Sequence, residues 1–414
     1  MKPCRGEHFW YATGRPGPTL ERWHMKILFV HDYYQRFGGE DAAALAEKAL
    51  LEKHAENVLL YTRDNNEIKG YSIAEKLASP FNAIYSTRTR REVVDIIREH
   101  RPDAAYIHNF FPLISPSLYH TLHASGVPSV QMAHDFRFMC PNGLFFTQGQ
   151  ICERCKEGTF LNAVRHRCYR DSYSASVVAA SVIAINRRAG LLNKLSAFVC
   201  PTEFSKQKLI EVGVPEQKLF IKPHFIDASQ IQPRFGQGNY VLYLGRLSAE
   251  KGLWTLVQTL AGMRDITLRI AGSGPLENHL RAYIREKELK HIEILGFKAG
   301  PEKWELLQNS LFLVVPSEWY ETFGLVVLEA YSAGKPVIGS NLGGLPFVIE
   351  NGKSGLLFQS GNSDDLREKI LYLLEKPDEI ETMGRYGREL VETKYHPEES
   401  YRTLRSVFSS VLSR

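Results

Sequence analysis

Short runs of β-branched and apolar residues alternate along the chain with longer segments of helical periodicity. The plainest helical segment is 40–54, where apolar residues recur on one face. Such alternation is typical of βαβ units and predicts a first α/β domain over 25–223. The buried strands of this domain are predicted at 27–30, 58–62, 104–108, 129–133 and 198–201.

A second series of the same kind follows a stretch punctuated by Pro and Gly, where periodicity is lost. We expect a hinge at 224–239, a second domain over 240–395, and a C-terminal helix at 396–414 that packs back on the first domain. Its strands are predicted at 240–244, 266–271, 292–295, 311–315 and 336–339. The expected fold class is therefore α/β, with two doubly wound Rossmann-like domains facing a cleft.

Length and the N-terminal residues refine this picture. A chain of 414 residues exceeds what one hydrophobic core usually supports, which agrees with two domains. Residues 1–24 lack both periodicity and the apolar core of a secretory signal, so we interpret them as a dispensable, disordered extension and expect a cytoplasmic protein. No apolar run approaches the roughly 20 residues that a membrane-spanning helix needs.

The charge is mildly basic. A formal net charge of +5 favours anionic partners such as phosphates or an acidic lipid surface, but it is too small to indicate nucleic acid. The one local cluster is Arg88, Arg90 and Arg91. We favour its interpretation as a solvated helix start over a peripheral contact with a membrane.

Two carboxylates eight positions apart, Glu321 and Glu329, form the most informative motif. A helix is predicted to begin near Gly324, and its unpaired amides and positive dipole end favour an anion. Because helical side chains lean toward the N-terminus, Glu329 can reach the same pocket and accept ribose hydroxyls, while Glu321 can accept sugar hydroxyls. The alternative is that both are solvated charges at a helix start.

A second motif places Arg246 just after a predicted strand and Lys251 just before a helix. Two cations there can neutralise a diphosphate leaving group in place of a divalent metal. The chain also lacks an Asp-x-Asp triplet, since the adjacent Asp364 and Asp365 are interpreted as a helix cap. We therefore expect catalysis to require no metal or other cofactor.

Together the two motifs resemble glycosyltransferase family 4, whose hallmark is Glu-x7-Glu preceded by a Gly-Arg-Leu…Lys-Gly segment; here they are 321–329 and 245–252. The resemblance implies the GT-B fold and a retaining transfer from a UDP- or GDP-sugar. It implies that Arg246 and Lys251 hold the diphosphate and Glu329 the ribose. The transferred sugar would contact Glu321 and the amides of Thr322, Phe323, Gly324 and Leu325.

The first domain supplies further candidates at the ends of its strands. Gly38 and Gly39 follow the first strand, and the amides of their tight turn are predicted to face the donor. His134 is predicted to hydrogen-bond the transferred sugar and to complete a catalytic set with Arg246, Lys251 and Glu321; a structural histidine is the alternative. Phe297 is a candidate neighbour of the base. Acceptor contacts are predicted for His108, Asn109, Asp135 and Arg137.

These residues lead to one principal hypothesis, the transfer of a hexose to a glycan or lipid-linked acceptor in polysaccharide or lipopolysaccharide synthesis at the inner membrane surface. The sequence offers no pair of nucleophile and acid carboxylates, which favours attack on the face that the leaving group departs from. A nucleotide-sugar epimerase of the same fold and a non-catalytic nucleotide-binding protein are the alternatives.

Four of the six cysteines lie in one insertion, 140–168. A Cys-x2-Cys knuckle flanked by single thiols can form a tetrahedral structural zinc site, with His166 as a substitute ligand. The alternative is a set of reduced cysteines in a cytosolic loop. The candidate ligands are Cys140, Cys152, Cys155 and Cys168.

Overall fold

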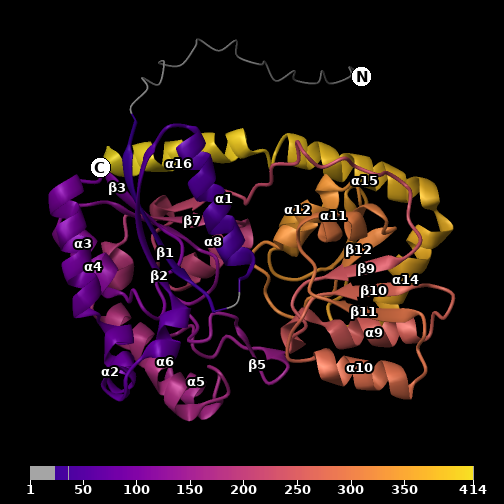
Figure 1. The fold of residues 1–414 in the computed structure, drawn as a ribbon, viewed down its shortest axis with the longest axis horizontal. Coiled ribbons are helices and arrows are strands. Elements are labelled where there is room, and N and C mark those ends of the chain that lie inside the picture. The colour runs from indigo at the N-terminus through magenta and orange to yellow at the C-terminus, as the bar shows by residue number, and fades with distance from the viewer. Residues whose placement is uncertain (1–23, 36, 414) are drawn as a thin grey trace, which may run out of the picture.

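A computed structural model describes residues 24–35 and 37–413, so the predicted extension at 1–24 lies outside the described residues except for His24. Two parallel six-stranded sheets dominate the molecule, one in each half of the chain (Figure 1). Helices cover both faces of each sheet. The predicted class, two doubly wound α/β domains, is confirmed.

The first sheet has the strand order β2-β1-β3-β4-β7-β8. One face is covered by α1 (Gly39–Lys53) and α16 (Pro397–Leu412). The other face carries α3 (Thr87–His100), α4 (Ser117–Ala124), α6 (Tyr173–Arg188), α7 (Leu191–Lys194) and α8 (Glu203–Glu211). The strands are β1 (Lys26–Tyr33), β2 (Asn57–Asp64), β3 (Ala104–Ile107), β4 (Ser129–Met132), β7 (Ala197–Cys200) and β8 (Leu219–Ile221).

The alternation within β1 explains why both faces of this sheet need helices. Ile27 and Phe29 pack toward α1 and α16, whereas Leu28 and Val30 pack toward the opposite helices, and all four are at most 2% exposed. A strand buried on both faces has a continuous hydrophobic sequence, which is the pattern of parallel sheets.

The second sheet has the order β11-β10-β9-β12-β13-β14. One face packs against α9 (Leu253–Ala261), α10 (Glu277–Glu286) and α14 (Ser363–Glu375), and the other against α11 (Gly300–Gln308), α12 (Leu325–Ser332) and α13 (Leu345–Val348). The strands are β9 (Val241–Leu244), β10 (Leu268–Ala271), β11 (Ile292–Gly296), β12 (Phe312–Val315), β13 (Val337–Ser340) and β14 (Gly355–Phe358).

The C-terminal helices connect the two halves. Helix α15 (Pro377–Glu392) packs on α12 of the second domain, and the chain then crosses back so that α16 lies over the first sheet (Figure 1). Leu404, Phe408 and Val411 enter the first core, and Tyr401 donates a 2.6 Å hydrogen bond to the buried Glu56. The predicted return of the C-terminal helix to the first domain is confirmed.

Sequence patterns missed β8 and β14, each of which lies at one edge of its sheet. Residues 222–240, all of them described, contain neither helix nor strand. The predicted cap at Asp364 and Asp365 is wrong in detail, since the Asn362 side chain accepts from both of their amides at 3.1 Å. Among the residues that the structure describes, no helix is long and apolar enough to cross a membrane.

Each sheet has one switch point, a pair of neighbouring strands from which the chain continues to opposite sides of the sheet. In the first sheet this switch point lies between β1 and β3, and in the second between β9 and β12. Loops that leave the carboxyl ends of such neighbouring strands turn to opposite faces and open a crevice, where ligands of α/β proteins bind. Both motifs of the second domain begin at its switch point.

Candidate active site

Two loops of the second domain are held together at this switch point. The loop after β9 and the loop after β12 are joined by a hydrogen bond from the Glu318 amide to the Glu250 carbonyl at 2.9 Å. Gly252 has a φ of +65°, and a Cβ there would lie 1.8 Å from the Pro316 carbonyl oxygen. Only glycine permits this approach, so the Gly of the Lys-Gly pair serves the packing of the two loops.

The contact brings Lys251 and Glu321 together. The Lys251 Nζ lies 2.7 Å from Glu321 Oε1, which also accepts a 2.7 Å hydrogen bond from the Ser317 hydroxyl. Glu321 is 8% exposed, and burial raises its pKa, but the Lys251 ammonium and the hydrogen bonds outweigh burial and hold the pKa below its usual value. The carboxylate therefore stays ionised in the protein interior.

Arg246 stands beside this pair in sequence but is exposed. Its backbone carbonyl accepts a 2.7 Å hydrogen bond from the buried Tyr243 hydroxyl, which fixes the start of the loop. Within the described part of the chain the Arg246 guanidinium forms no ion pair. The guanidinium therefore carries a permanent positive charge that is available to an anionic ligand.

Helix α12 begins where the sequence predicted. Gly324 is its N-cap, with a φ of +92°, and Leu325 is the first helical residue. A further Gly pair, which sequence reasoning left without a role, supports the preceding loop from behind. The Gly344 amide donates to the Glu321 carbonyl at 2.7 Å, and a Cβ on Gly344 would lie 2.4 Å from the Thr322 carbonyl oxygen. The adjacent glycines 343 and 344 were the signal in the sequence that could have predicted this close approach of the two loops.

Glu329 lies one turn further along and pairs with a different cation. Its Oε1 is 2.8 Å from Lys303 Nζ on α11, and both side chains are about a quarter exposed. Phe297, in the loop that leads from β11 into α11, is 68% exposed. The predicted ribose and base contacts thus lie on the α11 side of the site, and Lys303 is a residue that the sequence analysis missed.

His134 lies at the contact between the two domains. Its backbone carbonyl accepts a 2.9 Å hydrogen bond from the Thr322 hydroxyl, and its Nε2 lies 2.8 Å from His108 Nδ1. His224 stacks on its ring at 5.3 Å between centroids, and Phe323 meets the edge of His224 at 5.2 Å. The buried Thr322 and Phe323 therefore contact the first domain through their side chains.

These histidines are uncharged. Burial is the main cause that holds the pKa values of His108 and His134 well below the usual range and lowers that of His224 to about 3. The Lys222 ammonium, which is fully buried in an ion pair with Glu47, acts in the same direction. A neutral imidazole exchanges hydrogen bonds with a sugar without bringing a charge.

His108 and Asn109, predicted to contact an acceptor, are 2% and 4% exposed. The side-chain amide of Asn109 donates to the backbone carbonyl of Asp32 at 2.7 Å, and the backbone amide of Asp32 donates to the backbone carbonyl of Asn109 at 3.1 Å. Asn109 therefore ties the end of β3 to the end of β1. Both side chains are engaged inside the protein, which does not favour the acceptor role.

Asp135 and Arg137 form an ion pair at 3.1 Å, and the guanidinium lies 4.7 Å above the Phe111 ring. They line a cavity of about 10 Å³, together with Glu40 and His134, which is room for one water molecule. Burial and then the Asp135 charge raise the pKa of Glu40 well above its usual value. Glu40, which the sequence analysis did not select, thus joins the polar lining.

The glycines at 38 and 39 need another explanation than a tight turn. Gly38 has an extended backbone with a φ of −137°, which any residue adopts, so the turn interpretation is wrong. Its amide donates to Asp41 at 3.0 Å, and a Cβ would meet nothing within 4 Å. A Cβ on the exposed Gly39 would lie 3.6 Å from Leu325 at the start of α12. The Gly38 amide is thus engaged by Asp41, whereas the space beside the Gly38 Cα leaves room for a ligand to approach the loop.

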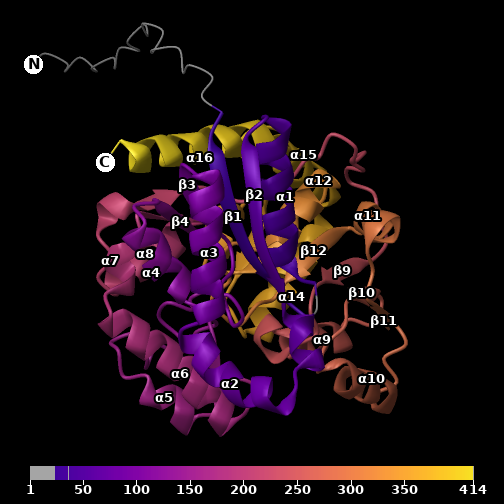
Figure 2. The same cartoon turned by 60° about the vertical axis from the view of Figure 1, so that its left-hand side comes forward.

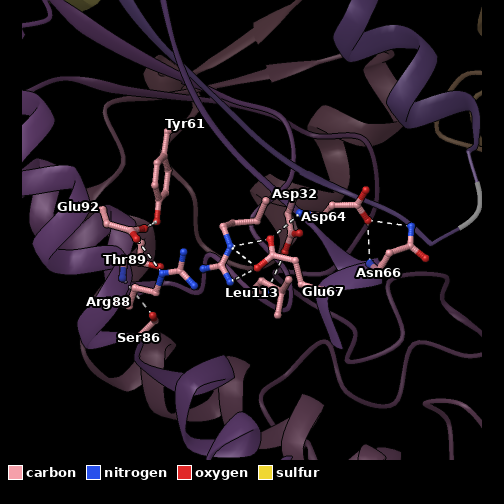
Figure 3. Close-up of polar contacts among 11 residues, drawn as sticks. Asp32, Tyr61, Asp64, Asn66, Glu67, Ser86, Arg88, Thr89, Glu92 and Leu113 are labelled. Atoms are coloured by element: carbon pink, nitrogen blue, oxygen red, sulfur yellow. Dashed lines mark hydrogen bonds and ion pairs between the residues drawn. The ribbon is translucent and has the colours of Figure 1, made fainter. Parts of the chain in front are cut away.

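Asp32, the last buried residue of β1, should make the stability of the protein depend on pH. Its Oδ2 accepts from the Leu113 amide at 2.7 Å (Figure 3), while Oδ1 is buried without a partner among the described residues. Burial raises the pKa of Asp32 from 3.8 to about 7. Between these values the folded state keeps a proton that the unfolded state loses, so the free energy of unfolding falls as pH rises.

Asp32→Asn removes this titration while keeping an acceptor for Leu113. As the pH rises from 5 to 7, the free energy of unfolding of the variant should increase by about 1 to 3 kcal/mol relative to that of the wild type, as measured by urea denaturation. The exposed Asp95, changed to asparagine, is the control. An equal effect of pH on wild type and Asp32→Asn would contradict the assignment.

The cysteine insertion contains a short hairpin, β5 (Phe146–Thr147) and β6 (Gln150–Ile151), and α5 (Leu161–Arg165). The Cys140 thiol donates to Asn142 at 2.9 Å, and the Cys155 side chain packs in an apolar cluster with Phe160 and Ile183. Among the described residues, no three or more His, Cys, Asp and Glu side chains are arranged to hold a metal. The predicted thiolate site is thus not assembled here.

Burial raises the pKa of Cys140 to about 11 and of Cys155 to about 12, so without a bound metal both remain protonated thiols. A zinc site needs thiolates. Zinc binding stays a prediction, which metal analysis of protein purified without chelator tests.

Comparison with known proteins agrees with this geometry. The family model for glycosyl transferases group 1 matches residues 225–390, and the model for glycosyltransferase family 4 matches residues 48–230. The two matches meet at the connection between the sheets and together extend over both domains. The chain belongs to the glycosyltransferases of this family 4 and group 1 type, and its fold is GT-B.

Curated relatives match only in part. The chain is 34% identical over 154 residues to an uncharacterised glycosyltransferase of Methanocaldococcus jannaschii, a match of 37% of this chain and 43% of the relative. It is 34% identical over 158 residues to the D-rhamnosyltransferase WbpZ of Pseudomonas aeruginosa, or 38% of this chain and 40% of the relative. The matched region thus spans less than half of each of these relatives.

Solved structures extend the likeness to the whole fold. Anabaena HepE in complex with UDP-glucose superposes with a TM-score of 0.67 at 19% identity, covering 94% of this chain and 100% of that one. The lipopolysaccharide outer core galactosyltransferase WaaB gives a TM-score of 0.63 at 17% identity, covering 93% and 99%. At such identities the likeness concerns the fold alone.

Proposed function

We propose that the protein transfers a glycosyl unit from a nucleotide-diphosphate sugar to a glycan or lipid-linked acceptor, with retention of the anomeric configuration. The observation that carries the proposal is the contact between Lys251 and Glu321 at the switch point, beside the exposed Arg246 and the N-terminus of α12. A uridine nucleotide is the first donor to test, because HepE is described in complexes with UDP and UDP-glucose.

In the proposed complex the second domain binds the donor. Arg246 and Lys251 would neutralise the diphosphate, and the free amides at the start of α12 would add to them. Glu329 would accept ribose hydroxyls once Lys303 yields, and Glu321, kept ionised by its neighbours, would accept hydroxyls of the sugar. No divalent metal is required in this arrangement.

The first domain would complete the reaction. His134 is uncharged, and its backbone carbonyl is hydrogen-bonded to Thr322 of the second domain; its side chain would hydrogen-bond the transferred sugar, and the loop of Gly38 and Gly39 would approach the donor. We expect the acceptor to attack from the face of the departing phosphate, which takes the acceptor proton. The description of WaaB as a lipopolysaccharide outer core galactosyltransferase supports a role in the synthesis of lipopolysaccharide or a related cell-surface polysaccharide.

Donor binding and stereochemistry test the proposal together. In a thermal-shift panel of nucleotide sugars, the true donor at a hundred times its Kd should add about 2.7 kcal/mol of stability by mass action. Transfer to an acceptor should then give a product with the donor's anomeric configuration by NMR. Inversion would refute retention. Conversion of the donor in acceptor-free solution, beyond slow hydrolysis, would indicate the epimerase instead.

A further inference from the structure

Helix α2 (Ile73–Ile84) presents three large apolar side chains to solvent. Ile73, Leu77 and Phe81 are 80%, 71% and 74% exposed, and their spacing of four places them along one face of the helix. A single exposed apolar side chain is ordinary, but a continuous row on one helix face marks an interaction surface.

The neighbouring helices α5 and α6 also carry exposed apolar side chains. Leu161 at the start of α5 is 77% exposed, and Tyr173 and Val177 on α6 are 61% and 48% exposed. Helix α6 packs against both α2 and α5. The three helices gather at one end of the first domain in both views (Figures 1 and 2). We call the exposed apolar side chains of α2, α5 and α6 the α2–α6 surface.

Basic residues accompany this surface. Residues 67–92 and 153–188 together contain twelve Lys and Arg against six Asp and Glu, whereas the whole chain has 51 against 46. Some of these charges are internally paired; Arg88, for example, donates to Glu92 at 2.7 Å (Figure 3). Arg90, Arg91, Arg165 and Arg170 are exposed, and none of them takes part in an ion pair within the described residues.

We propose that the α2–α6 surface binds an anionic lipid membrane, with its apolar side chains among the head groups and its arginines on acidic lipids. Protruding apolar side chains flanked by Lys and Arg are the composition of interfacial membrane helices. A second copy of the chain is disfavoured as the occupant, because two such basic surfaces repel each other.

The position in the fold fits a lipid-linked acceptor. Helix α2 follows the carboxyl end of β2, and α5 and α6 follow the carboxyl end of β4. His134 and Gly38 leave the same edge of the parallel sheet, so the surface and the candidate active site share one end of the first domain. Only this link to an acceptor rests on the proposed function; membrane binding itself does not.

Vesicle sedimentation of the full chain, without donor or acceptor, tests the proposal. We expect binding to vesicles that contain phosphatidylglycerol, little binding to pure phosphatidylcholine, and weakening by salt. Leu77→Glu combined with Phe81→Glu should lower the affinity at least about tenfold, since two apolar anchors are lost. Both side chains are more than 70% exposed, so the melting temperature should stay unchanged.

The matched control is Leu412→Glu, at a position that is 44% exposed on α16, away from α2, α5 and α6. It should bind vesicles like the wild type. Failure of the wild type to bind anionic vesicles, or equal binding by the double variant, would overturn the proposal. If the wild type does not bind vesicles but is a dimer in light scattering, and the double variant is a monomer, the surface is instead a contact between two copies of the chain. Donor binding by thermal shift should be the same in all variants.

Discussion

Replacing Lys251 by alanine should lower kcat/KM for the donor by about two to four orders of magnitude. Two effects combine in this variant. The diphosphate loses a cation that is prepositioned in a partly desolvated site, and such groups contribute several kcal/mol to the transition state. Glu321 also loses the ammonium that helps to hold its pKa below the usual value, so its pKa rises and the carboxylate takes up a proton more readily.

The kinetics of neighbouring variants separate these two effects. Lys251→Arg keeps the charge and should recover part of the activity, and Glu321→Gln should lose activity while donor binding by its nucleotide part persists. Lys353→Ala, at an exposed lysine 3.5 Å from Glu350, is the control and should behave as wild type. Full activity of Lys251→Ala would exclude the proposed donor site.

Replacing His108 by leucine should lower kcat by about 10- to 100-fold, while His108→Asn should stay within a few-fold of the wild type. His108 uses Nδ1 to meet His134 Nε2 at 2.8 Å, and an asparagine amide places a polar atom near that position. Leucine has almost the same shape as asparagine but offers no hydrogen bond. The pair therefore isolates the contact that fixes the tautomer and orientation of His134.

Steady-state kinetics and thermal unfolding of both variants check this prediction. A purely structural role of His108 would lower the stability of both variants and leave their kcat values alike. An orienting role predicts a loss in kcat that exceeds any change in KM for the donor and that asparagine rescues. Equal kcat values for leucine and asparagine would contradict the orienting role.

The fold was predictable because its signals are local. Runs such as 27–30 are hydrophobic without interruption since each strand is buried on both faces, and their alternation with helices specifies parallel sheets. The start of α12 at Gly324 was equally local, because glycine there adopts a left-handed backbone that other residues avoid. The strands β8 and β14 were missed, although β14 is as long as β3, which was predicted.

The charged residues of the candidate site could be predicted from the sequence, but their interaction partners could be predicted only in part. Arg246, Lys251 and Glu321 follow the ends of adjacent strands, so strand order brings them together. The partner of Glu329 is instead a lysine on a different helix, Lys303, which no spacing reveals. The zinc prediction rested on spacing as well, whereas the Cys140 and Cys155 side chains are packed among apolar neighbours.

By itself the sequence determined the two α/β domains, the return of the C-terminal helix and the identity of the charged motif residues, because periodicity and motif spacing are properties of neighbouring positions. The tertiary structure alone decided which groups meet. It buried His108 beside His134, placed the glycines at 343 and 344 against the Glu321 loop, and left Ile73, Leu77 and Phe81 of α2 exposed. Contacts between residues distant in the chain depend on how the layers pack, and packing leaves no period in the sequence.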